Sequence, residues 1–242
     1  MDFAFKLFIL SLLPILGRCS TDLLHQECHA DFNIFTNPNM KQNIDHVISD
    51  LLVKTTRDGY AIASYGSGSD AIHGLTQCRG DINLDACSAC ILEATHTVQA
   101  NCPFSADARL WYKLCFIRYS SNNFFGQLDT SYANGWASNK TADDPVDFNK
   151  VVTELLEVIK ITAATRDNKF ARGNSNSFKN NMIIYGMAQC TRDLQEQTCK
   201  QCLDEESKIM SKSCYSRFGC DVFNTDCRLK YENFNFLVGP AA

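Results

Sequence analysis

The sequence predicts an α+β fold of two tandem domains, each a small antiparallel β-sheet with two α-helices on one face, stapled by disulfides. Three observations support this fold class. A pattern of five cysteines occurs twice, each half of the chain has two stretches with helical periodicity, and runs rich in aromatic and β-branched residues indicate strands. The 242 residues suffice for two domains of about 100 residues each.

The cysteine pattern occurs once in each half of the chain, and both copies have the spacing C-x8-C-x2-C-x11-C-x12-C. The flanking residues agree as well, because IHGLTQC at 72–78 corresponds to IYGMAQC at 184–190. A solenoid repeat spans only about 20–50 residues, so we expect a tandem of whole domains. The first copy consists of Cys78, Cys87, Cys90, Cys102 and Cys115, and the second of Cys190, Cys199, Cys202, Cys214 and Cys227.

Apolar residues at spacings of three and four predict a helix over 43–56 and a counterpart over 148–164. A second helix is expected over 85–99, and its counterpart over 197–212. The residues of the second helix that we expect to face inward are Cys87, Cys90, Ile91 and Ala94.

The stretches that end at Cys78 and Cys190 are expected to be strands. Two further segments, 109–119 and 222–236, are rich in aromatic and branched residues and are also interpreted as strands. Loops such as 66–70, with two glycines and two serines, separate them.

The segment 1–19 is expected to be a secretory signal peptide. Lys6 gives a basic start, residues 7–16 form an apolar run, and small residues around Cys19 suit cleavage. A membrane anchor is the alternative, but a spanning helix needs roughly 20 apolar residues, and no later segment is apolar enough. Cleavage leaves twelve cysteines, an even number that suits a disulfide framework in an oxidising compartment.

We expect the first domain at 20–126, a linker at 127–145 and the second domain at 146–240. The linker contains turn signals and the single N-glycosylation sequon of the chain, Asn139-Lys140-Thr141, and we expect a glycan on Asn139. The formal charge of -4, with acidic and basic residues interspersed, gives no basic stripe, so nucleic acid is not an expected partner.

Three roles are open for the cysteines. They form structural disulfides, or Cys87, Cys90, Cys102 and Cys115 bind zinc, or the C-x2-C pairs are redox dithiols at helix starts. Secretion argues against zinc because thiols oxidise outside the cell, and each C-x2-C pair has four further cysteines in its domain as partners. We therefore expect structural disulfides and no metal or cofactor, but spacing alone leaves the pairing open.

The doubled C-x8-C-x2-C pattern behind a signal peptide, with no kinase or membrane segment after it, resembles the plant cysteine-rich repeat secretory proteins. Their repeat is the ginkbilobin-type, or salt-stress-response/antifungal, domain. The resemblance covers essentially the whole mature chain and implies an extracellular, apoplastic protein of defence or stress signalling. The disulfides that it implies are Cys28–Cys102, Cys78–Cys87, Cys90–Cys115, Cys190–Cys199 and Cys202–Cys227.

The second domain departs from the pattern of this family. No cysteine stands near residue 137, where the counterpart of Cys28 would fall, and Cys220 has no equivalent in the first domain. We expect Cys214 and Cys220 to pair with each other across a short loop.

The sequence contains no pattern that we interpret as catalytic. The five histidines, at 25, 29, 46, 73 and 96, form no H-E-x-x-H pair, and the serines of segment 66–69 do not match G-x-S-x-G. A triad assembled from distant residues stays open, so an apoplastic enzyme or thiol-redox protein is the third interpretation of the function.

Some single-domain members of the family bind mannose with an Asn after the N-terminal cysteine, an Arg six before the last cysteine and a Glu five after it. These groups supply fixed donors and acceptors for hydroxyls. The first domain has His29, Arg109 and Ser120 at these positions, whereas in the second Asp221 replaces Arg and Glu232 matches. We therefore treat His29, Arg109 and Glu232 as candidate carbohydrate-binding residues, with ordinary strand residues as the alternative, and expect weak or no mannose binding.

Aromatic residues gather around the linker and near the end of the second domain. They either form a protein-binding face or, as we favour, bury the interface between the domains. These residues are Phe124, Phe125, Tyr132, Trp136, Phe234 and Phe236. The sequence thus predicts a secreted, non-enzymatic binding protein without a membrane span, whose partner is an extracellular protein or a cell-wall glycan. A mannose-type antifungal lectin is the alternative.

Overall fold

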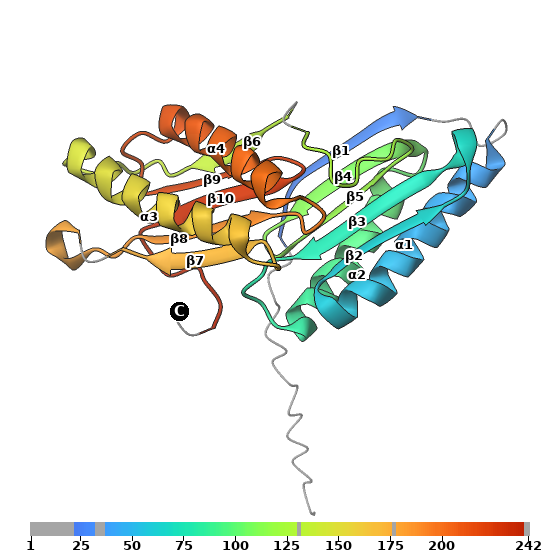
Figure 1. Cartoon of the computed structure of the whole chain (residues 1–242), viewed down its shortest axis with the longest axis horizontal. Helices are drawn as coiled ribbons and strands as arrows, with labels where there is room; N and C mark the ends of the chain where they lie inside the picture. Colours follow the sequence, from blue (N-terminus) through green and yellow to red (C-terminus); the bar gives the residue numbers. More distant parts are fainter. Residues whose placement is uncertain (1–21, 32–36, 130–131, 176–177, 240–242) are drawn as a thin grey trace, which may run out of the picture.

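The computed structural model describes residues 22–31, 37–129, 132–175 and 178–239. Within these residues the chain forms two five-stranded antiparallel sheets and four α-helices, and the predicted fold class is confirmed. Figure 1 shows the two domains side by side, the first in blue to green and the second in yellow to red. The expected signal peptide at 1–19, with Cys19, lies outside the described residues.

The first sheet has the strand order β1-β4-β5-β3-β2, and the second has the equivalent order β6-β9-β10-β8-β7. The elements of the first domain are β1 (Leu23–Asp31), α1 (Pro38–Asp58), β2 (Tyr60–Tyr65), β3 (Ile72–Cys78), α2 (Leu84–Asn101), β4 (Ser105–Tyr112) and β5 (Cys115–Ser120). Those of the second are β6 (Asn134–Ala137), α3 (Pro145–Thr165), β7 (Phe170–Asn174), β8 (Tyr185–Cys190), α4 (Glu196–Ser213), β9 (Gly219–Phe223) and β10 (Cys227–Glu232).

All four predicted helices are present, and each extends beyond the predicted range at both ends. Pro38 occupies the first turn of α1, where its missing N–H costs no hydrogen bond. At the other end, Gly59 adopts φ 72° and closes the helix in the left-handed conformation. The side chain of Asn83 caps α2 by accepting a hydrogen bond from Ala86 N at 2.9 Å.

Two segments that we predicted as single strands are hairpins, so these predictions were wrong. Segment 109–119 contains the end of β4 and most of β5, and segment 222–236 contains the end of β9 and all of β10. The first turn, at Lys113 and Leu114, has none of the usual turn residues. In addition, β6 lies inside the stretch 127–145 that we predicted as a linker, because four residues with an Asn-Gly pair indicate a turn rather than a strand.

The helices cover one face of each sheet, and the close approach of α1 to β3 explains a repeated glycine. A Cβ on Gly74 would collide with Val47 and Leu51 of α1, and one on Gly186 would press on Ile159 of α3. Glycine therefore stands at the same place in both copies. The residues of α2 that we expected to face inward, Cys87, Cys90, Ile91 and Ala94, are all buried.

Six disulfides join the described cysteines, three in each domain. They include the five pairs that the family resemblance implied and the pair expected in the second domain alone. The pairs are Cys28–Cys102, Cys78–Cys87, Cys90–Cys115, Cys190–Cys199, Cys202–Cys227 and Cys214–Cys220.

The two domains meet through reciprocal contacts of equivalent residues. Gln77 of β3 donates from Nε2 to the carbonyl of Cys190 at 2.8 Å, and Gln189 of β8 donates to the carbonyl of Cys78 at 2.9 Å. In each domain the same glutamine therefore bonds to the last residue of the equivalent strand in the other domain. The two domains are related by local two-fold symmetry at this junction.

The segments that follow β5 and β10 are also held reciprocally. The backbone N–H of Gly126, after β5, donates to the carboxylate of Asp193 in the second domain at 2.8 Å. The N–H of Val238, after β10, donates to the carboxylate of Asp81 in the first domain at 2.8 Å. The two acids hold equivalent places in the repeat, shortly after Cys78 and Cys190, so both copies use the same group for the same contact.

Candidate functional site

The sheet face opposite the helices, which we call the outer face, carries the candidate residues. Side chains alternate along a strand, and Ala108 of β4 and Ile117 of β5 are buried in the core beneath the helices. Arg109 and Arg118, their neighbours, therefore point to the outer face of the first sheet, and Glu27 of β1 pairs with Arg109 in register. Three adjacent strands place charged side chains side by side.

Arg109 lies between two carboxylates. Its Nε and Nη2 donate to the two oxygens of Asp107 at 3.0 and 3.4 Å, and its Nη1 is 3.6 Å from Asp129. The side chain of Arg109 is 13% exposed, so these ion pairs lie at the rim of the face. The guanidinium already has charged partners, and a ligand would have to share or replace them.

Arg118 is a buried charge that we did not single out from the sequence. Its guanidinium lies 4.0 Å from the centre of the Phe124 ring, 3.4 Å from Asp129 and 3.6 Å from Asp226 of the second domain. Burial, aided by the charge of Arg109, lowers the pKa of Arg118, whereas burial raises the pKa of Asp226 to about 7. The repeat of Ile117-Arg118-Tyr119 as Leu229-Lys230-Tyr231 was the available signal, because it places a cation at the same position in both copies.

His29 of β1 lies near the same rim. Its side chain is 57% exposed, its Nε2 is 3.4 Å from Glu27, and its register partner on β4 is Asp107. The structure therefore places His29 and Arg109 on adjacent strands of one face. Glu232, the third candidate, belongs to the second sheet and is buried, so the three residues do not form one site.

The first domain has a carboxylate at the place of Glu232, but a different strand supplies it. Glu232 of β10 stands opposite Gly219 of β9, and a Cβ on Gly219 would collide with its carboxylate. In the first domain the equivalent pair is Ser120 of β5 opposite Asp107 of β4. An acid is thus present at this place in both sheets. Only an alignment of both strands of each copy could have revealed Asp107 in the sequence.

The outer face of the second sheet has a self-contained charge cluster. Asp221 accepts hydrogen bonds from Arg228 at 2.6 Å and from Lys230 at 3.2 Å, and Lys230 also lies 3.0 Å from Glu232. Burial alone would raise the pKa of Asp221, but the two cations lower it below its usual value. The pKa of Glu232 is raised by burial, with Lys230 opposing the shift. Neither carboxylate is free to bind a ligand without breaking these ion pairs.

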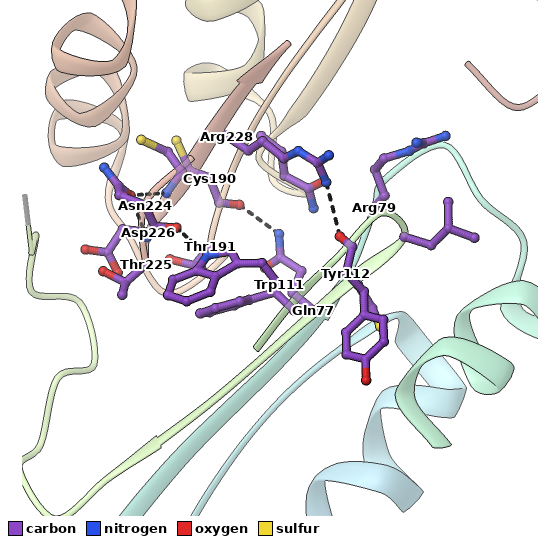
Figure 2. Close-up of a pocket in the computed structure, with 15 residues that line it drawn as sticks. Gln77, Arg79, Trp111, Tyr112, Cys190, Thr191, Asn224, Thr225, Asp226 and Arg228 are labelled. Carbon is purple, nitrogen blue, oxygen red and sulfur yellow. Dashed lines mark hydrogen bonds between the residues drawn. The ribbon is translucent and has the colours of Figure 1, made fainter. Parts of the chain in front are cut away.

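A cavity of about 60 Å³ lies where the two domains meet. Figure 2 shows Trp111, whose Nε1 donates to the carbonyl of Asn224 at 2.8 Å, and Arg228, which donates to the carbonyl of Tyr112 at 3.2 Å. The buried hydroxyl of Thr191 lines the cavity and has no hydrogen-bond partner among the described residues. This volume holds a few water molecules, whereas a ligand pocket needs roughly 300 Å³ or more. We do not consider it a ligand site.

The cysteines of each C-x2-C motif are bonded to other cysteines and not to each other. Cys87 pairs with Cys78 and Cys90 with Cys115, and all four are buried. A redox dithiol needs an accessible pair that forms and breaks its own disulfide. Within the described residues no group of three or more His, Cys, Asp or Glu side chains is placed to hold a metal ion.

One serine–histidine pair resembles the start of a catalytic arrangement. Ser64 of β2 and Nδ1 of His73 of β3 are 2.9 Å apart, and the edge of Phe125 contacts the imidazole. Among the described residues no carboxylate bonds to His73, and the pair lies on an open strand surface. A nucleophilic serine needs an oriented base and donors for an oxyanion, which this arrangement does not supply.

The aromatic residues divide into two groups, so our prediction that they bury the domain interface holds only for some of them. Phe124 is buried over Arg118, and Tyr132 stacks on His25 and donates to or accepts from its Nε2 at 2.6 Å. Trp136 and Phe234 are 54% and 56% exposed. Asn139 is exposed as well.

Both halves of the chain are similar to known proteins. The salt stress response/antifungal family model matches it twice, at 26–122 and 135–234. Cysteine-rich repeat secretory protein 55 of Arabidopsis thaliana is 33% identical over 239 residues, covering 95% of this chain and 90% of the relative. An antimicrobial ginkbilobin-2-like protein of Castanea crenata is 29% identical over 230 residues, with 95% of each chain covered.

The fold agrees with a solved structure. The crystal structure of the tandem DUF26 ectodomain of a cysteine-rich receptor-like protein of Arabidopsis thaliana matches with a TM-score of 0.77 and 26% identity, covering 91% of this chain and 100% of that one. In the described parts of this chain, every helix is too short or too polar to cross a membrane. With its doubled cysteine motif, paired sheets and six disulfides, the chain belongs to the salt stress response/antifungal family of cysteine-rich repeat proteins.

Proposed function

We propose that this protein is a secreted, non-enzymatic recognition protein of the plant apoplast that acts in defence or stress signalling. Its recognition surface is the rim of the first outer face, around His29, Arg109 and Asp107. One observation carries the proposal: an arginine flanked by two carboxylates lies on the strand next to an exposed histidine, on the same face of the sheet. Such groups both donate and accept hydrogen bonds, as the recognition of hydroxyls or peptide groups requires.

A cell-wall glycan fits this surface because sugar hydroxyls can bond to the arginine and the carboxylates at once. An extracellular protein is the alternative partner. The mannose-type lectin is less well supported, since His29 and Ser120 replace two of the three mannose-binding residues in the first domain and Glu232 is buried in the other domain. We expect weak or no mannose binding.

Two observations support a non-enzymatic role. The C-x2-C cysteines are committed to separate buried disulfides, which disfavours thiol exchange. Among the described residues, the Ser64–His73 pair has neither an orienting acid nor oxyanion donors beside it.

The test is a binding screen of the full secreted protein against an array of cell-wall glycans and a panel of extracellular receptor domains. For the ligand that binds, we expect Arg109→Ala to weaken affinity at least about 10-fold, the effect of losing a charged hydrogen bond. The matched control is Arg57→Ala, which removes an exposed arginine from the last turn of α1 on the opposite side of the sheet. Equal affinities of the two variants would contradict the proposed surface, and tight mannose binding lost in Arg109→Ala would favour the lectin.

A further inference from the structure

The second domain exposes an indole next to an exposed asparagine. Trp136, at 54% exposure, contrasts with Trp111, the other tryptophan of the chain, at 4%. Asn139 follows Trp136 closely in the sequence, and both Asn139 and Thr141 of the sequon are exposed. Lys230 Nζ lies 6.0 Å from the centre of the ring, and more than half of the Trp136 side chain stays exposed to water.

A β-bulge brings Asn139 to the face that carries Trp136. Ala137 pairs with Cys220, and Thr141 pairs with Arg217, so the three residues 138–140 stand against the two residues 218–219. Ser138 N donates to the carbonyl of Gly219 at 2.8 Å, which leaves Ser138 and Asn139 opposite this one glycine. Because Ala137 packs against the core, Trp136 points to the outer face, and the extra residue of the bulge turns Asn139 to the same side.

The backbone around the sequon is fixed rather than free. Phe218 N donates to the carbonyl of Lys140 at 3.0 Å, and Nη1 of Arg217 donates to the carbonyl of Asn139 at 3.3 Å. The backbone of Asn139 is therefore held at a constant place relative to the strand that carries Trp136. A group attached to Asn139 would not have to order a loop in order to reach Trp136.

We propose that Asn139 carries an N-linked glycan whose first N-acetylglucosamine packs its C–H face on the ring of Trp136. The positive C–H edges of a pyranose meet the negative face of the indole, and the contact removes apolar surface of both from water. In the transfer, Nδ2 of Asn139 forms a bond to C1 of a lipid diphosphate-linked oligosaccharide. The C1–O bond to the diphosphate breaks, the amide loses one proton, and the lipid diphosphate leaves.

This inference rests on the secretion that the proposed function contains, because the transfer takes place in the secretory pathway. A sugar packed on Trp136 would also leave this side chain unavailable for contact with a protein partner. Phe234 is as exposed as Trp136 but has no sequon beside it in the sequence, so it is the matched control.

The experiment is a double-mutant cycle on the full chain secreted from plant cells. Mass spectrometry first measures occupancy of Asn139. Asn139→Gln is then expected to lower the melting temperature by about 4 °C in the wild type and in Phe234→Ala, but to leave it unchanged in Trp136→Ala. An equal shift of the melting temperature in all three backgrounds would overturn the packing of the glycan on Trp136. Secreted protein without a glycan on Asn139 would overturn the glycosylation as well. Failure to leave the cell, with no glycan, would overturn secretion as well.

Tryptophan fluorescence measures the exposure of the Trp136 ring to solvent independently of the stability of the protein. Trp111 is buried, so acrylamide quenching of the native protein reports mainly on Trp136. We expect quenching to increase about twofold in Asn139→Gln, because the sugar no longer covers the ring. Unchanged quenching would show that the glycan does not pack there and would contradict the proposal, whatever ligand the first domain binds.

Discussion

The outer faces of the two domains have the same strand order but opposite relations to the rest of the molecule. In the first domain, Arg118 is neutralised from outside its sheet, by Asp129 of the connecting segment and Asp226 of the second domain. In the second domain, Lys230 is neutralised within its own sheet, by Asp221 and Glu232. The first face is therefore tied to the domain junction, whereas the second is electrostatically self-sufficient.

The core, in contrast, is built in the same way in the two domains. Tyr119 and Tyr231 occupy equivalent buried positions, and their hydroxyls donate to the carbonyls of Cys102 and Cys214 at 3.3 and 3.2 Å. Divergence after the duplication thus affected mainly outward-facing positions and kept most of the core packing. Such a pattern is what two uses of one scaffold require, because the fold is kept while the surfaces change.

The largest difference should come from the disulfide that distinguishes the domains. Cys28–Cys102 joins residues 74 apart and ties β1 to the end of α2, whereas Cys214–Cys220 joins residues only 6 apart. Chain-entropy estimates give a loss of unfolding free energy of about 4 kcal/mol for replacing the first pair by serines and about 2 kcal/mol for the second. Urea unfolding of the two double variants measures both. Equal losses would mean that the rewired bridge stabilises the second domain by another mechanism.

Removing the cation of the outer face should lower the unfolding free energy more in the first domain, where it is Arg118, than in the second, where it is Lys230. Arg118→Ala leaves Asp226 buried without its partner, and we expect a loss of about 3 kcal/mol in unfolding free energy at pH 8. Lys230→Ala should lower the unfolding free energy less, by about 2 kcal/mol, since Arg228 still neutralises Asp221 at 2.6 Å and only Glu232, whose pKa burial already raises, loses its cation.

The pH dependence tests the cause of this difference. The pKa of Asp226 is raised by burial to about 7 even with Arg118 present, so without Arg118 this carboxyl stays protonated to a higher pH. The loss caused by Arg118→Ala should therefore shrink below pH 6, as measured by urea unfolding at several pH values. A loss that does not change with pH would assign it to the contact with Phe124 instead.

The sequence predicted what depends on local pattern and on the repeat. The helical stripes located all four helices, and the spacing located the cysteines, but Lys113 and Leu114 form a hairpin turn without any turn residue. Asp107 was missed because it supplies from β4 the carboxylate that Glu232 supplies from β10 in the second domain. Residues on neighbouring strands are not adjacent in sequence, so the repeat does not align them. The contact of Arg118 with Asp226 needs the docking of two domains, which no local pattern encodes.

A further difference concerns a core position of α2 and α4. Glu206 of α4 is fully buried where the first domain has Ala94, and no hydrogen bond of normal geometry from the described residues reaches either carboxylate oxygen. Burial raises its pKa to about 8, and the amide of Asn224 offsets only part of this shift. The usual pKa of glutamate is 4.5, so between pH 4.5 and 8 the folded state binds more protons than the unfolded state, and stability falls as the pH rises.

Replacing this acid by its counterpart should remove that dependence. We expect the wild type to lose about 2 kcal/mol more than Glu206→Ala between pH 5 and pH 7.5, since each pKa unit corresponds to about 1.4 kcal/mol and burial is partly relaxed. Glu205→Gln, which removes a neighbouring acid that is 43% exposed, should keep the wild-type slope. Urea midpoints across this range measure the three profiles. If the profile of Glu206→Ala ran parallel to the wild type, the carboxyl of Glu206 would have to be hydrated and ionised in the folded state.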